Sequence, residues 1–217
     1  MTKWLVCTNI TSVMGENERN REQTRLRLIE AGKAEFLEKG YTQACLRDIC
    51  KRANVTTGAF YFYFSFANKE ALLHAILGPA VEQYQKLMQE LYVREAANPE
   101  TAIENDRMLF EFEYRHKEEL ILIMEKSEGS CYVNFKDTIK EQMKKSFWDY
   151  FLEKTGREPN AQLIEILTDM RMQSNLAVLK GNYSMEETLK LAESIGVYAD
   201  SGTNSLIEKM KKDAFWM

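Results

Sequence analysis

The segment LRDICKRANVTTGAFYFYF, at positions 46–64, decides the fold of this chain. Its apolar spacing predicts a short helix over residues 45–53 and a second helix after it. Asn54-Val55-Thr56 between them predicts a tight turn, because asparagine tolerates a positive φ and the threonine hydroxyl can cap the next helix. Phe60 and Phe64, four residues apart, are expected to face inward together. Two helices joined by so short a turn indicate a helix-turn-helix.

Helical periodicity continues on both sides of this segment. A first helix is expected over residues 21–39, with Gly40 as its left-handed cap. Asn68 is the predicted N-cap of a fourth helix, in which Gly78-Pro79 predicts a kink or a restart because proline removes a helical hydrogen bond. Asn98-Pro99 is expected to start the next helix.

The rest of the chain predicts long helices separated by short breaks, with Ser184 and Glu187 forming a capping box before the last one. These helices are expected at residues 101–126, 134–154, 161–180 and 185–212. The sequence therefore predicts an all-α protein of about nine helices, with an N-terminal three-helix helix-turn-helix domain and a larger C-terminal helical bundle. The expected divisions are residues 1–20 as an arm, 21–68 as the helix-turn-helix domain, and 69–217 as the helical body.

Composition excludes several classes of protein. No apolar run approaches the ~20 residues that a membrane-spanning helix needs. The four cysteines form no CxxC pair, and with two histidines a zinc site has too few ligands, so we expect free buried thiols in a reducing cytoplasm, with no metal or cofactor. Ten Lys and Arg stand against eight Asp and Glu between Met14 and Ala75, whereas the whole chain carries a net charge of -4. A mildly basic start on an acidic body suits a DNA-facing module.

The first thirteen residues differ in character from the rest of the chain, and Trp4-Leu5-Val6-Cys7 is too short an apolar stretch for a signal peptide. Two explanations remain open. This stretch is a flexible arm, or it precedes a true start at Met14.

The chain resembles the TetR family of transcriptional regulators over about fifty residues. The matching pieces, in order, are Leu28-Ile29, Ala31, Phe36, Gly40-Tyr41, Leu46-Arg47-Asp48-Ile49, Ala53-Asn54-Val55-Thr56, residues 58–64 and residues 68–73. Three features depart from the family pattern: Ala44-Cys45 replaces a threonine or serine cap, Asn54 replaces a glycine, and about two extra residues stand at Ser65–Ala67. The resemblance implies a repressor that binds double-stranded operator DNA as a homodimer and is released by a small-molecule effector.

The expected DNA contacts lie around the second short helix. Gly58-Ala59 supplies a thin leading edge, and the Thr56 and Thr57 hydroxyls can bind phosphate oxygens. Outward aromatic side chains can reach a phosphate, a base or a thymine methyl, and two cations can neutralise phosphates. These last candidates are Tyr61, Phe62, Tyr63, Arg47 and Lys69.

Two further sites are predicted in the C-terminal part. Small and apolar residues at helical spacing in the last helix suit close packing against another helix, and ordinary intramolecular core remains the alternative. The resemblance implies a dimer interface built from the last two helices, with these candidates: Leu163, Leu167, Met170, Ala177, Ala192, Gly196, Ala199, Gly202 and Leu206. Large soft side chains in the middle helices are core by default, but the resemblance implies an apolar ligand cavity there. Its candidate lining is Phe112, Phe135, Phe147 and Trp148.

Other functions find less support. The chain has no GxSxG, phosphate-binding loop or HExxH, and Glu113-Tyr114-Arg115-His116 is a single copy of the E-x-x-H motif that di-iron bundles use twice. We therefore expect no enzyme. The alternative is an interaction protein on the same scaffold that binds DNA without a small-molecule effector. The hypothesis for the regulator is that the effector moves the fourth helix, which bends at Gly78-Pro79 and separates the two DNA-binding heads.

Overall fold

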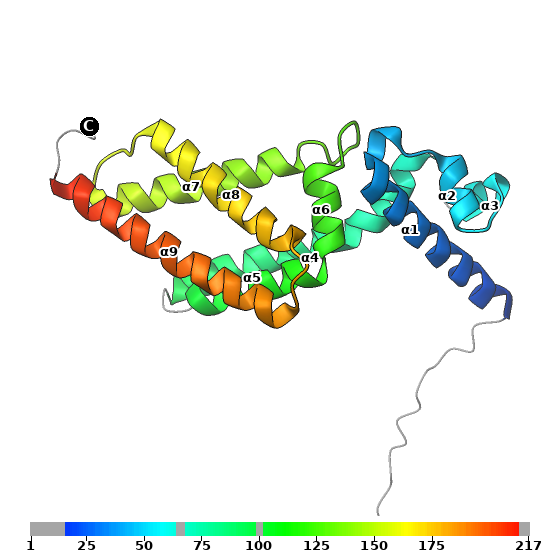
Figure 1. Ribbon diagram of the computed structural model, residues 1–217, viewed down its shortest axis with the longest axis horizontal. Helices are drawn as coiled ribbons and strands as arrows, with labels where there is room; N and C mark the ends of the chain where they lie inside the picture. The colour runs from blue at the N-terminus through cyan, green and yellow to red at the C-terminus, as the bar shows by residue number, and fades with distance from the viewer. Residues whose placement is uncertain (1–15, 64–67, 99–101, 213–217) are drawn as a thin grey trace, which may run out of the picture.

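The computed structural model describes residues 16–63, 68–98 and 102–212, which form nine α-helices and no strand (Figure 1). This confirms the predicted all-α class. The helices are α1 (Glu16–Gln43), α2 (Leu46–Arg52), α3 (Thr57–Tyr63), α4 (Lys69–Ala97), α5 (Ala102–Arg115), α6 (Lys117–Glu125), α7 (Phe135–Thr155), α8 (Ala161–Lys180) and α9 (Met185–Lys212).

The small end of the molecule is built from α1, α2, α3 and the start of α4. Gly40 interrupts α1 with φ 76° and ψ 160°. Its positive φ agrees with the predicted left-handed cap, but its ψ is extended and not left-handed helical. Asn54 takes φ 53° in the turn between α2 and α3, as expected. The Ala59 amide donates to Thr56 Oγ1 at 3.2 Å, and the Ala71 amide donates to Asn68 Oδ1 at 2.9 Å. These local contacts set where α3 and α4 begin.

One continuous core joins this small end to the body. Leu28, Phe36, Ile49, Phe60 and Leu72 are buried in it, and so are α6 residues such as Leu122. Helices α1 and α4 approach so closely that a Cβ added at Gly32 would stand 2.6 Å from Leu72 Cδ2. The expected boundary after residue 68 therefore falls within a shared core and not between two separate cores.

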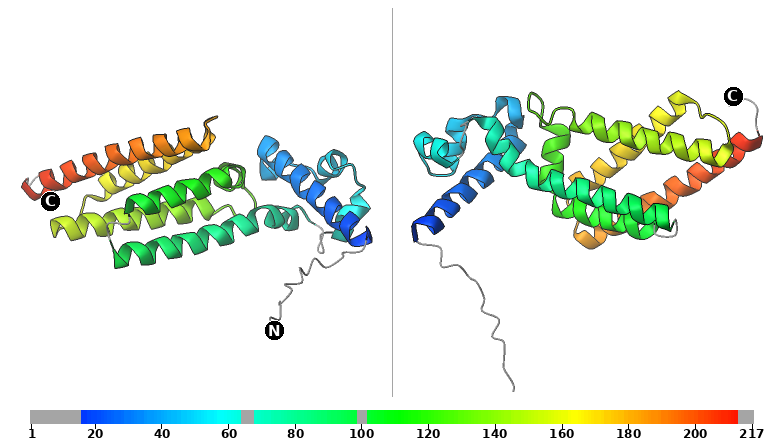
Figure 2. Two further views of the ribbon diagram at one scale, coloured as in Figure 1. Left: turned by 90° about the horizontal axis from the view of Figure 1, so that it is seen from below. Right: turned by 180° about the vertical axis from the view of Figure 1, so that it is seen from behind.

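Helix α4 runs from the small end into the body as one helix, and the view from behind in Figure 2 follows it. Of the predicted kink or restart at Gly78-Pro79, the restart is wrong, because Pro79 lies inside α4, and the kink stays a prediction. Proline costs one backbone hydrogen bond, but Ile76, Leu77 and Ala80 around it are buried, and their packing keeps the helix continuous.

The body consists of α4 to α9. The helix predicted over residues 101–126 is divided in two, because His116 takes a non-helical φ of -109° and ψ of 25° between α5 and α6. Helices α8 and α9 have the predicted bounds, and the capping box is present: the Ser184 amide donates to Glu187 Oε2 at 2.8 Å. Phe151, Ile164, Ile207 and Met210 form a second core where α7, α8 and α9 meet. No helix within the described ranges is long and apolar enough to cross a membrane.

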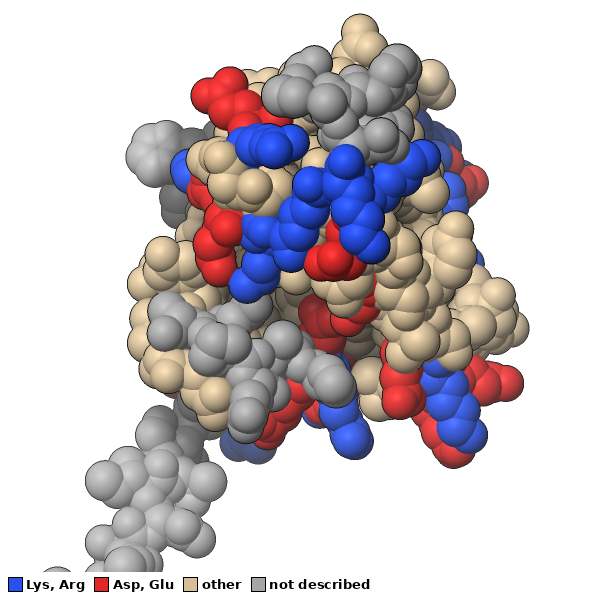
Figure 3. Space-filling model, turned by 90° about the vertical axis from the view of Figure 1, so that its left-hand side faces the viewer, with Lys and Arg blue, Asp and Glu red and all other residues tan. Residues whose placement is uncertain are grey.

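The end of the body farthest from α3 carries many Lys and Arg side chains (Figure 3). Lys154 stands in the last turn of α7, and Lys209, Lys211 and Lys212 stand in the last turn of α9. Cations at helix C-termini interact favourably with the helix dipole, which explains basic residues at this end of an acidic body.

The free thiols are only partly where we expected them. Cys50 is buried, but Cys45 and Cys131 are exposed. Cys45 is at the surface because it is the N-cap of α2 and not part of that helix's buried face. Cys7 lies outside the described residues.

Candidate functional site

Helix α3 presents one face to solvent and buries the other. Phe60 is 1% exposed, whereas Tyr61 and Phe62 are 52% and 62% exposed. Thr57 and Gly58 at its start are exposed, and Ala59 is half-buried. Phe60 therefore anchors α3 from behind while the predicted contact residues face outward. The Tyr63 side chain and Phe64 lie outside the described residues.

Arg21 joins this outward face, although it was not among the predicted contacts. Its guanidinium carbon lies 5.2 Å from the centre of the Phe62 ring, which is cation–π distance. The contact places a positive charge from the start of α1 beside α3. No sequence signal links these two residues, because they stand forty-one positions apart and meet only when α1 packs beside α3.

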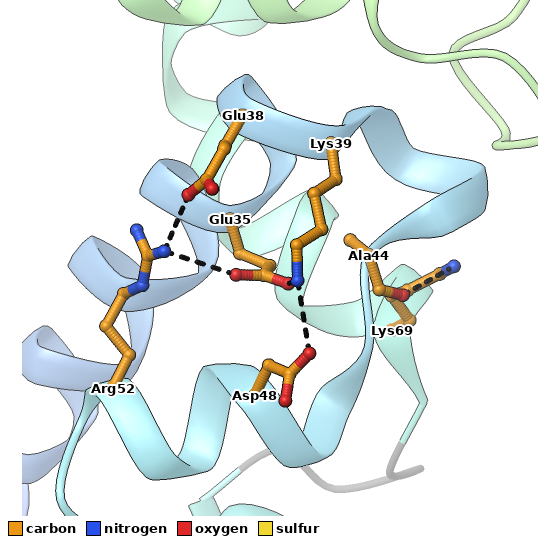
Figure 4. Close-up of polar contacts among 7 residues, drawn as sticks. All are labelled: Glu35, Glu38, Lys39, Ala44, Asp48, Arg52 and Lys69. Carbon is orange, nitrogen blue, oxygen red and sulfur yellow. Dashed lines mark hydrogen bonds and ion pairs between the residues drawn. The ribbon is translucent and has the colours of Figure 1, made fainter.

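A network of charged residues fixes α2 against α1 (Figure 4). The buried Glu35 carboxylate lies 2.6 Å from Lys39 Nζ and 3.4 Å from Arg52 Nη2. Lys39 also reaches Asp48 at 3.1 Å, and Arg52 reaches Glu38 at 2.7 Å. The Arg52 hydrogen bond lowers the pKa of Glu38. Because α3 follows α2 directly, this network sets the orientation of the outward face; its sequence signal is the Glu35–Lys39 spacing of four.

The two predicted phosphate-binding cations differ in their surroundings. Arg47 is exposed on α2 and has no ion-pair partner among the described residues. Lys69 is half-buried, and its Nζ donates to the backbone oxygens of Thr42 and Ala44, both at 3.2 Å. Its Nζ also lies 4.4 Å from the centre of the Tyr41 ring. The Lys69 ammonium therefore already stabilises the end of α1, and its contact with DNA stays a prediction.

The loop between α6 and α7, residues 126–134, bonds directly to the small end of the molecule. The Tyr41 amide donates to the Lys126 oxygen at 2.8 Å, and Thr42 Oγ1 donates to the Glu128 oxygen at 2.6 Å. Gly129 takes φ 79°, and a Cβ there would stand 3.1 Å from Thr42 Oγ1. The body thus holds the end of α1 through its backbone.

Glu70 at the start of α4 adds to this junction. Its carboxylate accepts a hydrogen bond from the Cys131 amide at 2.7 Å and a short one from the Tyr41 hydroxyl. Burial alone would raise the pKa of Glu70, but these hydrogen bonds outweigh burial and lower it. Farther along α4, His74 Nδ1 lies 2.7 Å from the Tyr132 hydroxyl. The loop therefore connects both α1 and α4 to the body.

The structure separates the four predicted pocket residues into two groups. Phe112 of α5 and Phe135 of α7 both stand with their ring centres 6.1 Å from that of Tyr84 on α4. Phe147 and Trp148 instead pack against the second core, around Phe151. An open surface depression on α4 includes none of the four; its lining is Glu82, Gln85, Lys86 and Gln89.

The E-x-x-H motif spans the end of α5 and the break before α6, and its Glu and His differ in their surroundings. The His116 ring stands 4.4 Å from that of Phe112. Glu113 Oε2 is buried without a hydrogen-bond partner, and burial raises the pKa of Glu113 to about 7, opposed by the charge of Arg171 and reinforced by that of Asp106. Within the described ranges, no three His, Cys, Asp or Glu residues gather as metal ligands would.

The predicted dimer residues divide between the inside and the outside of the body. Ala192 is buried, and Leu167 and Leu206 pack against the second core. Met170, Ala177 and Gly202 are exposed, and Leu163, Gly196 and Ala199 are half-buried. The outward row also includes residues that the periodicity did not select: Ile166 on α8, and Val197 and Tyr198 on α9.

Known proteins resemble this chain most clearly in its N-terminal part. Residues 28–76 match the family model described as bacterial regulatory proteins, tetR family. The chain is 36% identical over 66 residues to the HTH-type transcriptional regulator TtgR of Pseudomonas putida, which covers 30% of each chain. It is 42% identical over 55 residues to the A-factor receptor protein of Streptomyces griseus, which covers 25% of this chain and 19% of the receptor. The matched region thus spans less than a third of these relatives.

Solved structures extend the likeness over most of the chain. A transcriptional regulator from Aquifex aeolicus aligns with a TM-score of 0.51 and 26% identity, over 81% of this chain and 99% of that one. A TetR family regulator from Chloroflexus aurantiacus aligns with a TM-score of 0.53 over 88% and 93%, and its 14% identity shows the fold alone. These relatives are regulators and not enzymes. Residues 28–76 thus match the helix-turn-helix region of TetR-family regulators, and the chain as a whole shares the helical fold of solved transcriptional regulators of this kind.

Proposed function

We propose that this chain is a homodimeric cytoplasmic repressor that binds operator DNA through α3 and releases it when a small molecule enters the body. The observation that carries the proposal is the two-sided character of α3. On α3, the large aromatic side chains of Tyr61 and Phe62 are exposed, whereas the Phe60 side chain is buried in the core. Exposed aromatic side chains on a helix that comes after a short turn suit a recognition helix in the major groove.

The DNA-binding step is tested by replacing Tyr61. Tyr61→Ala should weaken binding to DNA from the chain's own upstream region by at least about tenfold, which is the loss of roughly 1.4 kcal/mol of contact energy. Tyr92→Ala is the matched control, because Tyr92 is 74% exposed on α4 in the body. Gel-shift titrations of both variants give the comparison. Equal affinity of the Tyr61 and Tyr92 variants contradicts the proposed role of α3.

The outward row on α8 and α9 supports the dimer. These two helices pack together and form one face of the body, at the top of the left-hand view in Figure 2. Ile166, Met170 and Val197 are large apolar side chains exposed on it, and a Cβ added at Gly196 or Gly202 would meet nothing within 4 Å. A self-complementary apolar face of this kind suits a two-fold dimer.

A charge placed in this face tests the dimer. Val197→Glu should convert a species of twice the 25.3 kDa chain mass into a monomer, whereas Val93→Glu should not. The two valines are alike in exposure, 63% and 56%, but Val93 lies on α4. Light scattering after gel filtration measures both masses. A Val197→Glu protein that stays dimeric refutes this interface.

The junction between body and small end supports the release step. The α6–α7 loop holds Tyr41 and Thr42 by backbone oxygens and reaches Glu70 at the start of α4. A ligand that moves α6 or α4 would shift α1 and α3 together, so ligand and DNA affinity would oppose each other. The test is to screen small molecules for those that raise the Tm of the chain, and then to measure DNA affinity in the presence of each. An interaction protein without an effector would keep the same DNA affinity with all of them.

A further inference from the structure

The interior of the body contains a carboxylate oxygen that no group among the described residues satisfies. Glu113 lies in the middle of α5, and its Oε2 is buried without a hydrogen-bond partner. A buried acceptor left unpaired costs about 1–3 kcal/mol, and more when it is charged. Because an apolar residue such as Leu in this place would avoid that cost, the unpaired oxygen is open to a partner that is not part of the chain.

The neighbouring charges show which sign of ligand would suit this carboxylate. Arg171 of α8 and Asp106 of α5 are the charged groups that act on Glu113, and Tyr84 of α4 experiences its charge in turn. Arg171 is already paired with Asp106 at 3.9 Å. An ionised Glu113 therefore leaves one negative charge in excess. An anionic ligand would compete with Asp106 for Arg171 and add to that excess, whereas a cation would balance it.

The groups next to Arg171 along α8 and next to Tyr84 point to a hydrogen-bond donor with an aromatic or alkyl part. Asn175, one turn after Arg171 on α8, has a second buried oxygen without a partner, Oδ1. Phe112 precedes Glu113 on α5 and belongs to the aromatic group with Tyr84 and Phe135. A protonated amine carries donors and no acceptor, and aromatic rings attract cations as well as apolar surface.

We propose that Glu113 is the recognition residue for an organic cation, a protonated amine attached to an aromatic or alkyl body, bound among α4, α5 and α8. The proposal rests on the proposed function, because it names the ligand class of the sensing body. The ammonium group donates to Glu113 and replaces the missing hydrogen bond with a charge-assisted one. The apolar part of the ligand lies against Tyr84, Phe112 and Phe135.

Binding should also release a proton. Burial raises the pKa of Glu113 to about 7, so near neutral pH a substantial fraction of the free protein carries a carboxylic acid at this position. An ammonium favours the carboxylate and lowers this pKa, so the proton passes to the buffer as the cation binds. Titration calorimetry in two buffers of different ionisation enthalpy measures the protons released.

Three probes with one aromatic body test the charge preference: 2-naphthylmethylamine, 2-naphthylmethanol and 2-naphthoate. The wild-type dimer should bind the amine about tenfold or more tightly than the alcohol, and the naphthoate least. Glu113→Gln should remove the preference for the amine and the proton release. Glu111→Gln is the matched control, because Glu111 lies two residues earlier on α5 and pairs with Arg107 and Arg115 at the surface. It should bind like the wild type.

Three results overturn the inference: equal binding of the amine and the alcohol, an amine preference that survives in Glu113→Gln, or no binding of the amine at millimolar concentration. DNA binding is measured on the same preparations without any probe. A protein that binds no DNA but prefers the amine refutes the regulator and keeps the cation site. A protein that binds DNA but does not prefer the amine keeps the regulator and refutes the cation site.

Discussion

Replacing Lys69 tests whether its ammonium stabilises the fold or binds DNA. Lys69→Met keeps most of the aliphatic stem and removes the ammonium that donates to the Thr42 and Ala44 oxygens. Hydrogen bonds from a charged donor contribute about 1.5–3 kcal/mol each, but one of these two is exposed and both are 3.2 Å long. We therefore expect a loss of about 2 kcal/mol in total, which lowers the Tm of a chain this size by roughly 4–8 °C.

The same variant should leave the salt dependence of DNA binding nearly unchanged. An ammonium that contacts a phosphate contributes about 0.9 to the slope of log affinity against log salt concentration. The assay is fluorescence anisotropy on a non-specific 30-base-pair duplex at several salt concentrations, with Arg47→Met as the exposed comparison. Arg47→Met should lower the slope by about 0.9 for each protomer that contacts the duplex and keep the Tm. If Lys69→Met keeps its Tm and lowers the slope instead, Lys69 binds phosphate and our reasoning about the end of α1 is wrong.

Three further predictions concern stability. Phe60→Ala should cost about 3–5 kcal/mol in urea unfolding because its ring is buried, while Phe62→Ala should cost less than about 0.5 kcal/mol; equal losses would contradict the orientation of α3. Glu35→Ala should lower stability by about 2–3 kcal/mol and also weaken DNA binding, since the buried carboxylate holds α2; unchanged stability would show the network to be dispensable. Glu113 is protonated in the folded chain and ionised in the unfolded chain between pH 4.5 and about 7, so its contribution to stability falls as pH rises through this window, by at most about 3 kcal/mol. The difference in unfolding free energy between wild type and Glu113→Gln should change over that window, and a constant difference from pH 5 to 8 would refute the burial of this carboxyl.

Local patterns predicted most of the helical plan. The caps at Thr56 and Asn68, the positive φ of Asn54 and the capping box at Ser184 each depend on atoms within three or four residues, and all are present. The errors arose where tertiary packing outweighed a local preference. Pro79 failed to divide α4 because its buried neighbours hold the helix together, and α5 ends at Arg115 although no proline or glycine marks the break.

In the candidate sites, too, local patterns predicted some features and tertiary packing decided others. The outward and inward faces of α3 followed from helical period alone, since residues one position apart point in different directions. Periodicity also identified apolar faces on α8 and α9, but it could not tell which side would meet the second core, so Ala192 and Leu167 proved to face inward while Ile166 was missed. Phe112 and Phe135 lie together near Tyr84, and Phe147 does not, because α7 packs different parts of its length against different helices.

By itself, the sequence determined most of the helices, the caps at Thr56, Asn68 and Ser184, the turn before α3, and that Phe60 faces inward while Tyr61 and Phe62 reach solvent, because each of these depends on neighbours along the chain. Only the tertiary structure decided the partners of Arg21, Lys69 and Glu113. Arg21 meets Phe62, Lys69 meets the end of α1, and Glu113 lies near Arg171, and these contacts join residues between twenty-five and fifty-eight positions apart. Such pairs form when helices pack, and no short-range pattern in the sequence specifies them.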